Sequence, residues 1–132
     1  MPKALLITDS DWVVNDVSAS LTIGGWEIET VSDPHDAADV AVDLSPDVIL
    51  VDMQVASMGG MAIVRDVRAS FQDSAPPRMV LLLDRSADRF LARRAMADAA
   101  VLKPFAAAEL RAAVIGNPAA GGVDDLDATE EE

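Results

Sequence analysis

The chain has 132 residues, no cysteine, a single histidine at His35 and a formal charge of −13 at pH 7. This length predicts one domain rather than two. Without cysteine the chain has no disulfides, zinc-thiolate sites or cysteine nucleophiles, and one histidine leaves little material for a multi-histidine metal site or a Ser-His-Asp triad.

Charge and hydropathy exclude further classes of partner. A net charge of −13 repels phosphate, so nucleic acid is not an expected partner. Apolar runs such as residues 80–83 are far shorter than the ~20 residues that cross a bilayer, so no transmembrane segment is predicted. Residues 1–3 lead into a strand-like run without the pattern of a signal peptide, which predicts a cytoplasmic protein.

Short apolar runs alternate along the chain with stretches of helical periodicity. The runs typical of strands are residues 4–7, 26–31, 48–51, 79–83 and 99–102. The amphipathic stretches that follow them are residues 11–23, 34–44, 61–71, 86–97 and 106–115. Alternation of this kind predicts an α/β fold, with parallel strands joined by helical crossovers and helices on both faces of the sheet.

Residues at the boundaries of these elements support the assignment. Ser10 or Asp11 is expected to cap the first helix, and Pro34 suits the first turn of the second. Ser86 is expected to cap the fourth helix. Residues 53–60 are expected to form a loop.

Residues 117–132 have a different composition from the rest of the chain. Pro, Gly, Ala, Asp and Glu dominate, and residues 124–132 alone carry six acids. We therefore predict a folded domain over residues 1–116 and a largely disordered acidic tail over residues 117–132. The tail is expected to increase solubility; alternatively it reaches a basic partner, or folds back onto the region of Arg89 and Arg93.

Chemically useful side chains follow the predicted strands. Asp9 follows the first, Asp52 ends the third, Asp84 follows the fourth and Lys103 follows the fifth. The carboxyl ends of parallel strands share one edge of the sheet, where ligands collect in such folds. Clustered carboxylates bind hard cations such as Mg²⁺, and a nearby lysine pairs with a phosphoryl group or a carboxylate.

Four short motifs along the chain resemble those of response regulator receiver domains, the modules phosphorylated on aspartate in two-component signalling. They are LITD at 6–9, PDVILVDM at 46–53, MGG at 58–60 and KPF at 103–105. Each motif is weak alone, but their order and spacing are specific. The resemblance implies a doubly wound, five-stranded parallel sheet of flavodoxin-like order 2-1-3-4-5, with helices on both faces.

The resemblance also implies roles for individual residues. Asp52 stands at the phosphoacceptor position, Lys103 at the position of the family's lysine, and Asp9 at the first position of its acidic pair. Mg²⁺ would be held by Asp9, Asp52 and the backbone carbonyl of Gln54. In this family the metal neutralises the phosphoryl oxygens while the aspartate attacks the phosphodonor.

Three departures from the family pattern count against ordinary phosphorylation. Ser10 replaces the second acid, a direct metal ligand, so Mg²⁺ binding is expected to be weak or absent. Asp84 replaces the Ser or Thr that binds the phosphoryl group and is alternatively an exposed acid paired with Arg85 or Lys103. Arg85 beside it either pairs with Asp84 or narrows the entry. Ala100 replaces the aromatic residue that rotates inward on activation.

A cluster of cations is the expected protein-docking surface. Its members fall within ten residues: Arg85, Arg89, Arg93 and Arg94. We expect an atypical stand-alone receiver that is not an enzyme and acts by protein binding without phosphorylation, as a docked regulatory or accessory subunit of a larger assembly. The alternative is a conventional relay in which a histidine kinase or other donor phosphorylates Asp52 in the presence of Mg²⁺. A transcription factor is disfavoured because no helix-turn-helix pattern follows Ile115.

Overall fold

The computed structural model describes residues 2–71 and 74–116. Its central sheet has five parallel strands in the order β2-β1-β3-β6-β7. Their bounds are β1 (Lys3–Ile7), β2 (Glu27–Val31), β3 (Val48–Asp52), β6 (Arg78–Leu83) and β7 (Ala99–Leu102). This is the predicted order 2-1-3-4-5. The expectation of a disordered tail concerns residues 117–132, which lie outside the described residues.

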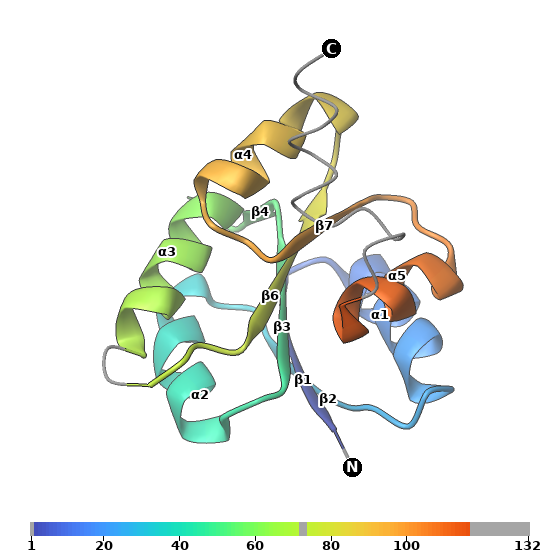
Figure 1. The fold of residues 1–132 in the computed structure, drawn as a ribbon, viewed down its shortest axis with the longest axis horizontal. Helices are drawn as coiled ribbons and strands as arrows, with labels where there is room; N and C mark the ends of the chain where they lie inside the picture. The colour runs from blue at the N-terminus through green and yellow to red at the C-terminus, as the bar shows by residue number, and fades with distance from the viewer. Residues whose placement is uncertain (1, 72–73, 117–132) are drawn as a thin grey trace.

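Helices cover both faces of the sheet, as predicted (Figure 1). One face carries α1 (Asp11–Thr22) and α5 (Ala107–Ile115), and the other carries α2 (Ala37–Leu44), α3 (Gly60–Ser70) and α4 (Arg89–Arg94). One-turn 3-10 helices, η1 (Pro34–Asp36) and η2 (Ser86–Asp88), precede α2 and α4. No helix among the described residues is long and apolar enough to cross a membrane.

Two separate hydrophobic clusters hold these layers together. Because successive strand side chains point to opposite faces, Leu5 and Ile7 of β1 pack with α2 and α3, whereas Leu6 packs with α1 and α5. All five residues of β3 are buried, which matches its predicted central position. Each fully buried Leu, Ile or Val contributes about 1.5–3 kcal/mol relative to an exposed one, so the apolar strands dominate the stability of the fold.

The fourth predicted helix is shorter than expected. Its sequence pattern extends to residue 97, but the structure has η2 followed by six residues of α4. Met96 adopts a left-handed conformation (φ 65°), its N–H bonds to the carbonyl of Arg93, and the N–H of Ala97 bonds to the carbonyl of Ala92. These are the two hydrogen bonds of a Schellman ending, which usually has glycine at the left-handed position. Ser86, the expected cap, lies within η2 and makes no capping bond.

The loop expected over residues 53–60 contains a small antiparallel hairpin, formed by β4 (Gln54–Val55) and β5 (Met58–Gly59). Ala56 lies at its turn with φ 53°, and its N–H donates to Asp9 Oδ2 at 2.9 Å. This long-range bond stabilises a turn for which the local sequence contains no glycine or asparagine signal.

Gly60 begins α3 against the end of β3. A Cβ at this position would lie 2.6 Å from the carbonyl oxygen of Asp52 and 2.8 Å from Leu81 Cδ1. Gly60→Ala is therefore expected to lower the free energy of unfolding by about 1–3 kcal/mol, because the clash is with backbone and buried side chain. Urea denaturation checks this, with Gly59→Ala as a matched control that has nothing within 4 Å of the added carbon. Equal losses for the two variants would contradict the steric explanation.

Candidate functional site

The site lies at the carboxyl ends of four neighbouring strands. Asp52 is the last residue of β3, while Asp9, Asp84 and Lys103 lie just beyond β1, β6 and β7. Because β1, β3, β6 and β7 are adjacent and parallel, their ends form one edge. The structure thus places the four side chains selected from the sequence along a single rim, as predicted.

Lys103 joins two of these carboxylates. Its Nζ forms an ion pair with Asp52 Oδ1 and a second one, 2.9 Å long, with Asp84 Oδ1. The side chains of Lys103 and Asp52 are only 7% and 5% exposed, whereas that of Asp84 is 55% exposed. One buried ammonium therefore compensates one buried and one partly exposed carboxylate.

The environment of Lys103 favours its charged form. Burial acts to lower the pKa of the ammonium, but the hydrogen bonds and charges of Asp52 and Asp84 oppose this and leave the pKa raised above its ordinary value. Lys103 Nζ also lies 5.8 Å from the ring centroid of Trp12, within the range of a cation–π contact. Lys103 is therefore a permanent cation of the site at neutral pH.

Thr8 is a site residue that sequence reasoning missed. Its hydroxyl donates to Asp52 Oδ2 at 2.7 Å, and the N–H of Met53 donates to Asp52 Oδ1 at 2.9 Å. With Lys103 also on Oδ1, both carboxylate oxygens of Asp52 have protein donors. The one available signal was a threonine ending the apolar run of β1, since a buried hydroxyl requires a partner.

The residues assigned to Mg²⁺ fit a metal poorly. Asp9 Oδ2 accepts from the N–H of Ala56, so one oxygen of this carboxylate already has a protein donor. Ser10 replaces a carboxylate, and within residues 2–71 and 74–116 no three His, Cys, Asp or Glu side chains are grouped as metal ligands. A hard cation would have to compete with Lys103 and Thr8 for the oxygens of Asp52.

Ala100 is buried in β7 and packs in the cluster shared with α3 and α4. A methyl group at this position has no rotamer that moves between core and solvent. The aromatic switch implied by the family pattern is therefore missing from this strand.

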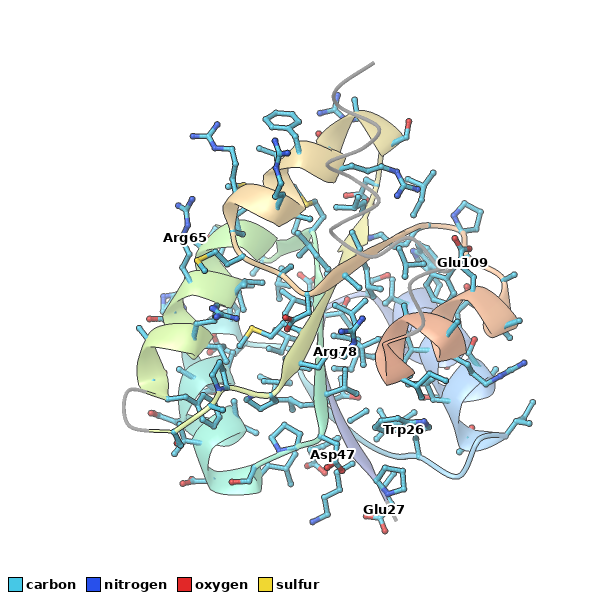
Figure 2. All side chains as sticks on the ribbon, in the orientation of Figure 1. Trp26, Glu27, Asp47, Arg65, Arg78 and Glu109 are labelled. Atoms are coloured by element: carbon cyan, nitrogen blue, oxygen red, sulfur yellow. The ribbon has the colours of Figure 1, made fainter. Side chains whose placement is uncertain are left out.

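The cation cluster is larger than the sequence indicated. Arg85 pairs with Asp88 at 3.0 Å, so the expected alternative of an Arg85–Asp84 pair is wrong, whereas the alternative of a Lys103–Asp84 pair is confirmed. Helix α3 adds Arg65 and Arg68, and Arg68 Nη1 donates to the carbonyl of Met96 at 3.3 Å. Figure 2 shows Arg65 projecting outward from α3 on the side of α4. These neighbours come from different parts of the chain, so spacing alone could not reveal them.

Comparison with known proteins agrees with this geometry. The model of the response regulator receiver domain family matches residues 4–115, and the chain belongs to that family. It is therefore a receiver domain with a response-regulator-like function.

Solved structures from three organisms share the fold. The chemotaxis protein CheY4 of Vibrio cholerae is 26% identical, with 84% of this chain and 93% of that chain covered and a TM-score of 0.70. The BeF3-activated N-terminal receiver domain of RstA from Klebsiella pneumoniae is also 26% identical, with 83% and 92% covered and a TM-score of 0.71. The receiver domain of the sensor histidine kinase PA1611 from Pseudomonas aeruginosa PAO1, 24% identical with 86% and 93% covered and a TM-score of 0.74, has a magnesium ion coordinated in its active site cleft.

Proposed function

We propose that this chain is an atypical receiver that acts by protein–protein binding without phosphorylation, as a docked regulatory or accessory subunit of a larger assembly and not as an enzyme. The observation that supports it is the double ion pair of Lys103 with Asp52 and Asp84. The lysine that would bind an incoming phosphoryl group already binds a carboxylate of the protein. We also propose residues 1–116 as the receiver unit and residues 117–132 as a separate acidic tail.

Electrostatics at Asp84 support the same proposal. An ionised carboxylate cannot donate a hydrogen bond to a phosphoryl oxygen. Two like unit charges ~4 Å apart repel by up to about 4 kcal/mol at an effective dielectric of ~20. Because the Asp84 side chain is 55% exposed, solvent screening reduces this repulsion to about 1 kcal/mol, the scale of an ordinary hydrogen bond. Ala100 also removes the aromatic side chain that would carry the signal from Asp52 to a partner surface.

Intact mass spectrometry after incubation with Mg²⁺ and acetyl phosphate tests this proposal. We expect no phosphate-sized gain in mass, because both oxygens of Asp52 are bonded to protein donors and Lys103 is shared with Asp84. Asp52→Asn serves as the control. A gain in the wild-type chain that is absent from this variant would contradict phosphorylation independence.

The second candidate function is a conventional relay phosphorylated on Asp52 by a histidine kinase or another donor. Asp9, Asp52 and Lys103 stay together at the strand ends, which favours it. Asp9, Asp52 and the backbone carbonyl of Gln54 would hold Mg²⁺ weakly, and the metal would neutralise the charge of the phosphoryl group. A phosphate gain confined to chains that retain Asp52 supports this function over the first.

The docking surface proposed for a protein partner comprises Arg85, Arg89, Arg93 and Arg94. We expect Arg89→Glu/Arg93→Glu to weaken capture of a partner from lysate by about tenfold or more, because charge reversal replaces attraction with repulsion. Quantitative pull-down checks this, with Lys3→Glu/Arg111→Glu as a control of equal charge change. Equal capture by the two double variants would remove this surface from the proposal.

A further inference from the structure

Six of the ten cations of the chain lie on α3, on α4 or directly before η2: Arg65, Arg68, Arg85, Arg89, Arg93 and Arg94. The same elements, over residues 60–70 and 85–97, carry only two acids, Asp66 and Asp88. Asp88 is 7% exposed and paired with Arg85, so it does little to offset the charge of the remaining arginines. We call the surface formed by Arg65, Arg68, Arg89, Arg93 and Arg94 the arginine ridge.

Two exposed apolar side chains border the arginine ridge. Phe90 is 40% exposed on α4, and Met96 is 63% exposed at the left-handed residue that ends this helix. An apolar side chain beside several cations suits an acidic segment that also contains an apolar residue. The segment 124–132 has this composition, with six acids around Leu126.

The length of chain between α5 and residue 124 allows the acidic segment 124–132 to reach the arginine ridge. Helix α5 ends at Ile115 and α4 lies on the other face, with the edge strand β7 between them. Seven residues lie between Gly116 and Asp124, and the eight Cα–Cα steps that join the two span up to ~28 Å when extended. A folded domain of this size has a radius of gyration of about 13 Å, so the segment can pass the β7 edge and reach the far face.

We propose that the acidic segment 124–132 binds intramolecularly to the arginine ridge and competes there with any acidic partner. Single exposed ion pairs contribute little, about 0–1 kcal/mol each. Here several acids face several arginines, and the short tether raises the effective concentration of the segment to the millimolar range. The contact is electrostatic, so salt weakens it as the Debye length falls from ~10 Å at 0.1 M to ~3 Å at 1 M. This contact does not depend on phosphorylation of Asp52.

The absence of native cysteine allows a direct test on the full chain. A nitroxide on Ala128→Cys changes no charge in the segment and reports its position by paramagnetic relaxation of backbone amides. At low salt, we expect amides of α3 and α4 to lose intensity by about twofold or more relative to those of α2 and β2, because the tether keeps the segment nearby. In 1 M NaCl this selective loss is expected to disappear.

A pair of variants and a mixed sample complete the test. Arg65→Glu/Arg89→Glu is expected to abolish the selective loss, and Lys3→Glu/Arg111→Glu, with the same change in net charge, to retain it. Equal behaviour of the two variants, or a loss spread evenly over all faces, overturns the proposal. A selective loss of amide intensity that arises between molecules also overturns it, because the arginine ridge then binds the segment of a second copy. This is measured by mixing isotope-labelled unmodified chains with unlabelled spin-labelled chains.

Discussion

Replacing Lys103 by methionine is expected to lower the free energy of unfolding by about 3–5 kcal/mol, because it leaves a buried charge without its partner. Asp52 is 3% exposed and would retain only the hydrogen bonds from Thr8 and Met53. Asp84 would also lose its cation. Urea denaturation followed by circular dichroism at pH 7.5 measures the loss.

Asp52→Asn is the informative control for this prediction. It removes the buried negative charge, and Lys103 keeps its ion pair with the partly exposed Asp84. We therefore expect a smaller loss of about 1–2 kcal/mol, the scale of an imperfectly replaced hydrogen bond. A Lys103→Met loss no larger than that of Asp52→Asn would show that the buried ion pair is not what stabilises this end of the sheet.

The direction of the Lys103 pKa shift determines how the difference in the free energy of unfolding between wild type and Lys103→Met depends on pH. A lysine whose pKa is raised by folding contributes stability that is fully present below its unfolded pKa of ~10.4 and is lost as pH rises through the folded pKa. The difference between wild type and Lys103→Met is therefore expected to be constant from pH 7 to 9 and to narrow above about pH 10.4. Denaturation curves at several pH values check this sign.

The second large effect is expected at Asp84. Asp84→Thr removes a negative charge that faces an incoming phosphoryl group and restores a hydroxyl donor. Full removal of a repulsion of ~4 kcal/mol corresponds to about a thousandfold in rate, and solvent screening of the exposed carboxylate reduces this towards tenfold. Phosphorylation of Asp52 by acetyl phosphate and Mg²⁺, expected to lie below detection in the wild-type chain, is thus expected to accelerate by about ten- to a thousandfold and to give a phosphate-sized gain in mass.

Two further variants locate the cause of this acceleration. Adding Ser10→Asp to Asp84→Thr restores the missing acidic ligand and is expected to lower the Mg²⁺ concentration that half-saturates the reaction. Asp84→Thr/Asp52→Asn is expected to show no gain in mass. If Asp84→Thr leaves the rate unchanged, Asp84 is not what prevents phosphorylation of Asp52. Thr8, which donates a hydrogen bond to Asp52, then becomes the next residue to test.

The elements of this fold were predictable wherever local periodicity carries the signal. The apolar run of β3 requires cover on both faces, and the structure buries all five of its residues. The ends of α4 and the hairpin of β4 and β5 were not predictable in this way. Met96 and Ala56 take left-handed conformations without being glycine, and hydrogen bonds formed by the folded chain hold them there.

For the candidate site, the identity of the residues was predictable from sequence, but their pairing was not. Asp9, Asp52, Asp84 and Lys103 were identifiable from sequence because parallel strands end at one edge, so position along the chain determines position on the rim. The sequence allowed Asp84 to pair with either Arg85 or Lys103, and only the tertiary structure decided between these partners. Lys103 forms ion pairs with both Asp52 and Asp84, and Arg85 forms one with Asp88. The hydroxyl of Thr8 donates a hydrogen bond to the second oxygen of Asp52. Ion pairs and hydrogen bonds depend on distances of a few ångströms between strands far apart in sequence, and no local pattern encodes those distances.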